Sequence, residues 1–324
     1  MIFQNSNHSW MATMKTIFIV LTLSVMVFLQ GCSSIQENIS AVLFSLEMKR
    51  SDIRVSTVKV NAGDVKYLER KGQGSAVILL HGFSSDKTDW IRFIRYLPEN
   101  YHVIALDLPG HGDNIENHLS SYDPLSLSHG ISDVIDALKL EKFHLAGNSL
   151  GGLVSKLYAT AHPDRVISLG LFNSAGVTPP VPGDFYDALQ KGDNPFDVKT
   201  KADWENLKTY ALYRQPFIPW PVDNVMAEKH IKNNAFYQKI FQSMTAHQTM
   251  TDPEFQVNIL ENLAMPVLVI WGDKDRILNV SSVDVYSRHI KNLQTLIIKD
   301  CGHVPMIEMP EVSAQRYAQF IKRL

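Results

Sequence analysis

The sequence contains only two cysteines, Cys32 and Cys301, among its 324 residues. Two cysteines allow one disulfide at most, which excludes the small disulfide-rich scaffolds of secreted proteins. The fold must therefore be stabilised by a hydrophobic core, and the chain is long enough for one large domain or a domain with a sizeable insertion. Apolar residues make up 45% of the chain and charged residues 20%, an ordinary globular composition.

The chain also lacks an excess of charge of either sign. Lysine and arginine number 31 against 33 aspartate and glutamate residues, and no long basic run occurs. Proteins that bind nucleic acid concentrate positive charge, so we expect no nucleic acid as a partner. Internal repeats and low-complexity tracts are missing as well, which leaves a globular fold as the expectation.

No apolar run in the sequence reaches the length that a transmembrane helix needs. The N-terminal apolar segment extends from Ile17 to Leu29 and has 13 residues, whereas a helix needs about 20 to cross a bilayer. Its length is typical of a signal peptide, and Lys15 precedes it. An uncleaved anchor is the alternative, because no charged residue occurs between Thr16 and Gln36. Both interpretations export the rest of the chain and tether it to a membrane.

The segment ends in Leu29-Gln30-Gly31-Cys32, which resembles the lipobox of bacterial lipoproteins. In that family the cysteine is lipidated and becomes the first residue of the mature chain. The resemblance implies a lipoprotein signal peptide over residues 1–31, lipidation of Cys32 and a place in the cell envelope, as an outer-membrane lipoprotein. With Cys32 lipidated, Cys301 has no partner, so we expect no intrachain disulfide.

Strand and helix patterns alternate along most of the chain. We expect residues 32–50 to form an N-terminal helix or tether that either lies on the membrane or docks on the body of the protein. Continuous apolar runs such as AVILLHG, HVIALDLPGHG, FHLAG and VISLGLFN predict strands covered on both faces, with helices between them. VSTVKV and VKYLER precede them as an antiparallel pair. The expected fold class is α/β, with a mostly parallel, doubly wound sheet.

The alternation stops after residue 176. Residues 177–262 are rich in Pro, Trp, Tyr and Lys, with helical patterns at 203–213 and 233–244, and strands resume with PVLVIWGDKD. We therefore predict a helical cap over 177–262, inserted into a core formed by 51–176 and 263–324. An independent second domain is the alternative.

A serine lies at the turn between one predicted strand and the next helix. Gly147-Asn148-Ser149-Leu150-Gly151 fits the pattern G-x-S-x-G, which alone is weak evidence. Following a buried strand and opening a helix, it matches a nucleophile elbow, in which the serine is strained and glycines let strand and helix approach. Ser149 is thus the candidate nucleophile, and a plain strand-to-helix turn is the alternative.

A serine hydroxyl needs a base, and the base needs an acid that orients it. Among twelve histidines, His303 lies in the loop between the last predicted strand and the last helix, whereas His111 is explained equally well by its turn. Asp275 follows a buried strand 28 residues before His303, and Asp273 is its rival. The chain order serine, aspartate, histidine is the one that α/β hydrolases use.

The tetrahedral intermediate formed by a serine nucleophile also needs hydrogen-bond donors for its oxyanion. LLHGF ends the first long buried strand, so the backbone N–H groups of Phe83 and of Leu150, just after the candidate nucleophile, are the expected pair. The alternative for His81-Gly82 is a simple end of the strand.

From about residue 52 to 324 the chain resembles the α/β-hydrolase superfamily, and within it the exported triacylglycerol lipases and esterases of Gram-negative bacteria. The stretches that carry the resemblance are HGFSSDKTDWIRFIRYL, YHVIALDLPGHGD, GNSLGG, VLVIWGDKDRIL and CGHVPMIEMP. It implies Ser149 as nucleophile, Asp275 as acid, His303 as base, and Phe83 and Leu150 as oxyanion donors, with no cofactor and no metal. Leu150 stands where methionine is commoner in these lipases.

The expected activity is hydrolysis of carboxylic esters, of acylglycerols or other lipids, through an acyl-enzyme. A carbon–carbon bond hydrolase of the same fold is one alternative, since its elbow also reads Gly-Asn-Ser, although export argues against its cytosolic substrates. A catalytically dead binding protein is another, but no triad residue is missing. A further hypothesis is an acyl pocket lined by aromatic and proline-rich cap residues, such as Trp204, Phe217, Trp220 and Phe236; core packing of the cap is the equal alternative for each of them.

Overall fold

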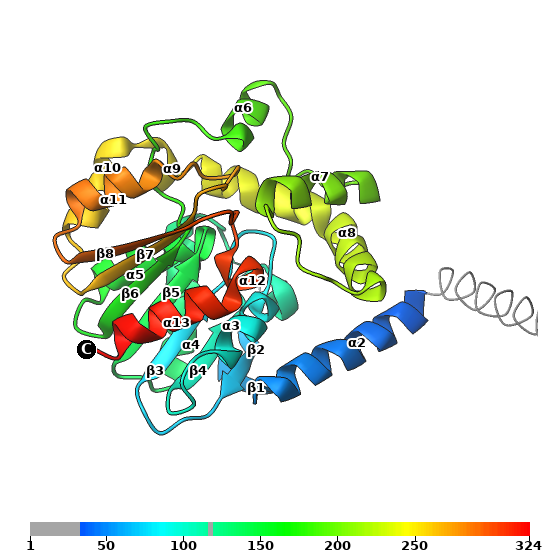
Figure 1. The fold of residues 1–324 in the computed structure, drawn as a ribbon, viewed down its shortest axis with the longest axis horizontal. Helices are drawn as coiled ribbons and strands as arrows, with labels where there is room; N and C mark the ends of the chain where they lie inside the picture. The colour runs from blue at the N-terminus through cyan, green and yellow to red at the C-terminus, as the bar shows by residue number, and fades with distance from the viewer. Residues whose placement is uncertain (1–32, 116–118) are drawn as a thin grey trace, which may run out of the picture.

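A twisted eight-stranded sheet with helices on both faces forms the body of the protein (Figure 1), and the computed structural model describes residues 33–115 and 119–324. The strands are β1 (Arg54–Val60), β2 (Gly63–Arg70), β3 (Ala76–Leu80), β4 (His102–Leu106), β5 (Phe143–Asn148), β6 (Val166–Phe172), β7 (Val267–Gly272) and β8 (Leu293–Ile298). Their order is β1-β2-β4-β3-β5-β6-β7-β8. β2 is antiparallel to β1 and β4, and the other neighbours are parallel. The predicted doubly wound sheet is confirmed.

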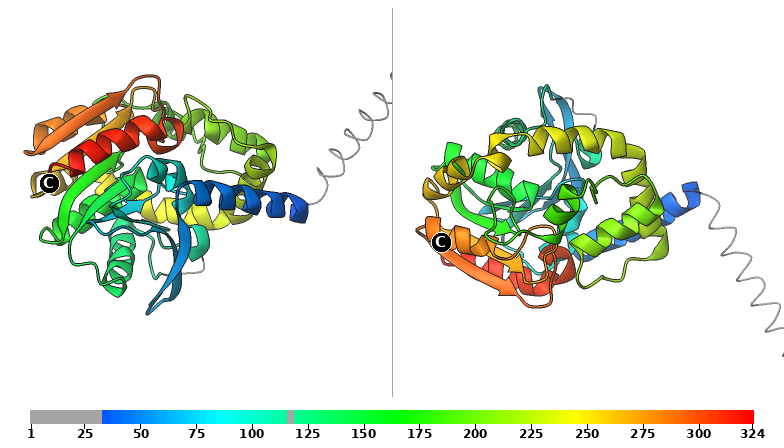
Figure 2. Two further views of the ribbon diagram at one scale, coloured as in Figure 1. Left: turned by 60° about the horizontal axis from the view of Figure 1, so that its bottom comes forward. Right: turned by 90° about the horizontal axis from the view of Figure 1, so that it is seen from above.

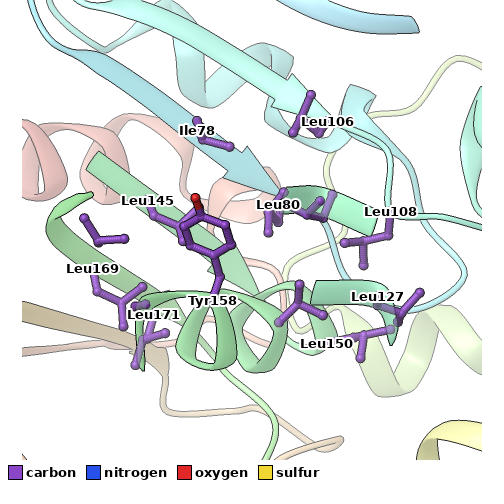
Figure 3. Packing of buried hydrophobic residues seen from close by; sticks show 14 of the residues in the cluster. Ile78, Leu80, Leu106, Leu108, Leu127, Leu145, Leu150, Tyr158, Leu169 and Leu171 are labelled. Carbon is purple, nitrogen blue, oxygen red and sulfur yellow. The ribbon is translucent and has the colours of Figure 1, made fainter. Parts of the chain in front are cut away.

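The central strands are largely apolar because helices cover both faces of the sheet. Along β3, Ile78 and Leu80 face one helical layer while Val77 and Leu79 face the other. The first layer holds α4 (Pro124–Ala137), α5 (Leu150–Ala161) and α11 (Ser282–His289), and the second α3 (Ile91–Arg95), α12 (Pro305–Glu308) and α13 (Pro310–Ile321). In Figure 3, Tyr158 of α5 lies over leucines of the neighbouring strands. Two buried cores therefore hold the sheet from either side.

Five helices lie between β6 and β7 in the chain. They are α6 (Asp184–Gln190), α7 (Lys201–Ala211), α8 (Trp220–Thr245), α9 (Gln248–Thr251) and α10 (Pro253–Glu261), called the inserted helices below. Figure 1 shows α6, α7 and α8 outside the two layers that cover the sheet. α7 begins with a capping box in which Thr200 and Asp203 bond each other's backbone N–H. The predicted helical patterns at 203–213 and 233–244 fall in α7 and α8.

Helix α2 (Ser33–Arg50) docks on the body of the protein, one of the two positions that its sequence left open. It lies against α8 and α3 (Figure 2). Glu47 near its end pairs with Arg95 at 2.8 Å and with Arg92 at 3.5 Å. The predicted signal peptide over 1–31 and Cys32 lie outside the described residues.

Within 33–115 and 119–324, none of the helices combines the length and the apolar character needed to cross a membrane.

The core on the α3 side of the sheet predicts a large cost for losing one aromatic ring. Phe93 is fully buried, with its ring 5.0 Å from that of Trp90 and 5.4 Å from that of Phe172. We expect Phe93→Ala to lower the free energy of unfolding by about 3–5 kcal/mol through lost burial and a cavity. Tyr96→Ala is the matched control, because Tyr96 is 38% exposed. Equal losses for both variants in denaturant titrations would contradict this packing.

Candidate active site

Five loops that follow strands carry the polar groups of the site. Phe83 follows β3, Ser149 follows β5, Asn173 follows β6, Asp275 follows β7 and His303 follows β8. All five strands are parallel, so their carboxyl ends meet along one edge of the sheet. Residues spread over more than half of the chain are thereby brought to one edge.

The turn from β5 into α5 holds Ser149 in a strained conformation, with φ 52° and ψ −118°. The backbones approach so closely that a Cβ on Gly147 would collide with the Gly151 carbonyl. A Cβ on Gly151 would likewise lie 2.5 Å from the carbonyl oxygen of Leu80 on β3. Only glycine fits at these two positions, so the G-x-S-x-G pattern reflects backbone packing here.

Hydrogen bonds fix the strained serine in place. Its N–H donates to Phe172 O at 3.0 Å, and its own carbonyl accepts from Ala175 N–H at 3.0 Å. The neighbouring Asn148 is buried and donates from Nδ2 to both Phe172 O and His303 O, each at 3.0 Å. The turn is therefore bonded to the end of β6 and to the histidine loop.

His303 and Asp275 form a buried pair, with Nδ1 of the ring 2.8 Å from Oδ2 of the carboxylate. The second oxygen of Asp275 accepts from the N–H groups of Ile277 at 2.8 Å and Leu278 at 2.9 Å. A carboxylate bonded in this way fixes both the tautomer and the orientation of a histidine. Ring atom Nε2 is then left for another partner.

Asn173 is a member of the site that the sequence analysis missed. Its Nδ2 donates to Asp275 Oδ2 at 2.7 Å and to Gly302 O at 3.3 Å, and the residue is fully buried. Its backbone has φ 43°, which asparagine tolerates better than most residues. The only signal in the sequence is its place directly after the strand VISLGLF, at the edge of the sheet to which the loop of Asp275 also belongs.

Ser149 and His303 line one cavity. Among the described residues no hydrogen bond joins the serine hydroxyl to the ring, and such bonds often tighten only when substrate is bound. Leu150 is the first residue of α5, where backbone N–H groups have no partner within the helix. Phe83 lies on the wall of the same cavity, and Leu150 directly follows Ser149 in the chain. Both predicted oxyanion donors are therefore close to Ser149.

Two other buried histidines near Phe83 bond to nearby loops. Nδ1 of His81 donates to Gly82 O at 2.7 Å and Nε2 accepts from Leu108 N–H at 3.0 Å. Burial lowers the pKa of His81 to about 4 and, for the same reason, that of His111 to about 3. Both rings are therefore neutral near pH 7 and brace the loops after β3 and β4.

Ser149 lies between two cavities. The larger, of about 350 Å³, is lined by apolar side chains that include Phe83, Phe185, Phe196, Phe241 and Met244. The smaller, of about 130 Å³, contains Ser149 and His303 together with polar side chains. Both volumes are bounded in part by the inserted helices.

The four aromatic residues expected to line an acyl pocket do not line the larger cavity, which corrects that hypothesis. Phe217 is 83% exposed and Trp220 44% exposed, and Phe236 packs on Tyr122 instead. Trp204 borders only the smaller cavity. Other aromatic residues form the wall of the larger cavity. The prediction named the wrong ones because composition does not reveal which face of each inserted helix points inward.

No cluster of three or more histidine, cysteine, aspartate or glutamate side chains suited to a metal ion occurs within residues 33–115 and 119–324. Cys301 has a buried, unpaired thiol, and burial raises its pKa.

The strand order, the strained serine turn and the cavities define an α/β protein of hydrolase architecture. Residues 77–316 match the model of a family described as the alpha/beta hydrolase family. Lipase 1 of Psychrobacter immobilis is 30% identical over 299 residues, which cover 90% of this chain and 92% of that lipase. Monoacylglycerol lipase abhd6-B of Xenopus laevis is 30% identical over 264 residues, with 79% and 77% covered.

One solved structure, of a membrane phospholipase A described as a bacterial virulence factor, has a TM-score of 0.83 and 32% identity. The match covers 96% of this chain and 98% of that one. The chain belongs to the alpha/beta hydrolase family, and the predicted similarity to bacterial lipases is confirmed.

Behind the serine turn, Lys156 of α5 is fully buried without a carboxylate partner. Its ammonium donates to Ala175 O at 2.7 Å, Gly176 O at 3.3 Å and the hydroxyl of Tyr286 at 2.9 Å. Burial lowers its pKa to about 7. The lysine therefore ties α5 to the loop whose Ala175 N–H bonds Ser149.

Lys156 makes the stability of the protein depend on pH. Below about pH 7 it is protonated in both states, whereas between about 7 and 10.5 only the unfolded chain keeps the proton, so the free energy of unfolding rises with pH. We expect the Tm of the wild type to rise by a few degrees, relative to Lys156→Met, between about pH 6 and pH 9. Lys142→Met, at an exposed site, is the control. Parallel curves for wild type and Lys156→Met in thermal unfolding would contradict the shift.

Proposed function

We propose that the protein is a serine hydrolase that cleaves carboxylic esters of lipids through an acyl-enzyme. Ser149 is the nucleophile, His303 the base and Asp275 the acid. The observation that carries the proposal is the meeting of the strained Ser149 and the buried His303–Asp275 pair at one cavity. Ser84 also has a positive φ, of 56°, and borders this cavity, but among the described serines only Ser149 combines a positive φ with the turn from a buried strand into a helix.

The reaction follows from the orientation of these groups. Oγ of Ser149 attacks the ester carbonyl while Nε2 of His303 takes its proton, and Asp275 stabilises the resulting imidazolium. The backbone N–H groups of Phe83 and Leu150 donate hydrogen bonds to the carbonyl oxygen and stabilise the negative charge that develops on it. His303 then protonates the leaving alcohol, and water activated by the same ring releases the acid from Ser149.

A lipid ester fits the larger cavity, because its walls are apolar and its volume of about 350 Å³ is large enough for an acyl chain. Relatives named as lipases, in Psychrobacter immobilis and Xenopus laevis, support the same substrate class. The inserted helices act as the cap of this enzyme, because Phe185, Phe196 and Phe241 from that segment close the cavity over Ser149.

Replacing the serine tests the proposal directly. We expect Ser149→Ala to lower kcat on p-nitrophenyl esters and on emulsified triolein by at least about 10⁴-fold, because no other group forms the acyl-enzyme. Ser287→Ala, at an exposed position of α11, is the control. Activity that survives Ser149→Ala would refute the assignment of Ser149 as the nucleophile. Activity on short soluble esters alone would make the enzyme an esterase rather than a lipase.

The enzyme is further proposed to be an exported, membrane-tethered lipoprotein of the cell envelope. The lipobox-like residues before Cys32 and the apolar segment from Ile17 to Leu29 support this location. The relatedness to a membrane phospholipase A is consistent with it.

The lipid anchor has a direct chemical test. We expect labelled palmitate to be incorporated into the wild type and not into Cys32→Ser, because the thiol at residue 32 is the acceptor. Cys301→Ser is the matched control, since its thiol is buried and should leave labelling unchanged. Labelling of Cys32→Ser at the wild-type level would exclude Cys32 as the lipidated residue, and a wild type without label would favour the uncleaved anchor.

A further inference from the structure

The two cavities that meet at Ser149 differ in charge. The larger one has no acidic or basic side chain on its wall among the described residues. The smaller one has four such side chains, namely Asp89, Lys208, His230 and His303. An ester bound across Ser149 therefore meets an apolar environment on one side and a polar one on the other.

The chemistry assigns the two sides, given the proposed function on which this inference rests. His303 must reach the oxygen of the leaving alcohol in order to protonate it. Since His303 lines the smaller cavity and not the larger one, the alcohol moiety occupies the smaller cavity. The acyl chain then occupies the larger, apolar one.

Two of the polar groups in the alcohol cavity are already satisfied by protein partners. Lys208 pairs with Glu205 at 2.8 Å and with Asp223 at 2.9 Å. Nδ1 of His230 bonds Met226 O at 2.9 Å, and burial lowers the pKa of that ring. The positive charge of Lys208 is therefore balanced by two carboxylates, and the ring of His230 is uncharged near pH 7.

Asp89 is the exception. Its Oδ2 accepts from the hydroxyl of Ser85 at 2.5 Å, but its Oδ1 accepts no hydrogen bond from any described residue and is not sealed inside the protein. It takes part in no ion pair of the described chain, because Lys229 pairs with Asp86 instead, at 2.9 Å. Burial, followed by repulsion from Asp86, raises the pKa of Asp89 to about 7.

We propose that Asp89 is a specificity-determining residue that accepts a hydrogen bond from a free hydroxyl group on the alcohol moiety of the substrate. The substrate class is therefore an ester of a polyol with at least one free hydroxyl, as in partial glycerides. Asp89 also borders a third cavity, which lies beneath α2, so a larger alcohol moiety has room beyond it. Ser85 holds the carboxylate from the other side, as a positioning residue.

Three decanoyl esters test this assignment: 1-monodecanoylglycerol, ethyl decanoate and decanoylcholine. The acyl chain is constant, and only the first has a free hydroxyl, whereas the third has a positive charge. Assays at about pH 8.5 keep Asp89 ionised. We expect Asp89→Leu to lower the ratio of kcat/KM for the glycerol ester to that for the ethyl ester by about 10- to 100-fold, the usual loss for a hydrogen bond to a charged group.

Asp89→Asn keeps the shape and one acceptor oxygen, so its ratio should fall less, which also covers the case in which the leucine variant fails to fold. Asp133→Leu makes the same substitution at an exposed site on α4 and should keep the wild-type ratio. A ratio within about twofold of wild type in both Asp89 variants would overturn the inference. An equal fall for decanoylcholine would overturn it too, because charge rather than the hydroxyl would then be recognised.

Failure of the proposed function is distinguishable from failure of this inference. If the wild type cleaves none of the three esters, the hydrolase proposal itself fails. If it cleaves them in a Ser149-dependent way and the ratio does not depend on Asp89, only the specificity assignment fails.

Discussion

The turn from β5 into α5 brings two backbones so close together that neither Gly147 nor Gly151 can carry a side chain. The same closeness leaves Ser149 at φ 52°, a conformation that costs an ordinary residue on the order of 1–3 kcal/mol. This strain persists because β5 is buried on both faces and α5 packs along its whole length on the sheet. The two-sided core therefore supports a serine that is presented above the sheet and not absorbed into it.

The remaining groups of the site depend on the order of the strands. β5, β6, β7 and β8 are adjacent and parallel, so their carboxyl ends bring Ser149, Asn173, Asp275 and His303 together, even though the inserted helices separate β6 from β7 in the chain. Each of these loops bonds the next: Ser149 N–H to the end of β6, Asn173 to Asp275, and Asp275 to His303. The orientation of the histidine is thus set by a chain of contacts that starts at the serine turn.

Much of this arrangement could be predicted from the sequence, because its signals are local. Apolar runs marked β3 to β7, and G-x-S-x-G after one of them marked the turn, since backbone crowding admits only glycine there. Asn173 and Lys156 escaped prediction because their partners come from distant elements, which a single sequence does not pair. Asp89 escaped because its place on a cavity wall depends on the inserted helices opposite it. The cavity wall escaped for a similar reason: α8 has polar residues on most of its length, so its inward face is set by packing.

The inserted helices help to position His303 as well as forming part of the cavity walls. His303 N–H donates to Ala211 O at the end of α7, at 2.9 Å. Glu308, in the helix after His303, accepts from Gly302 N–H at 2.9 Å and from the N–H groups of Tyr213 and Arg214 at 3.0 and 2.7 Å. The end of α7 and the histidine loop are therefore one bonded unit. A movement that opens the cavity at α7 must therefore break these bonds or carry His303 with it. Helix α6 makes none of them and is bonded instead to the loop of Asp275, through Phe185 N–H to Arg276 O at 2.9 Å.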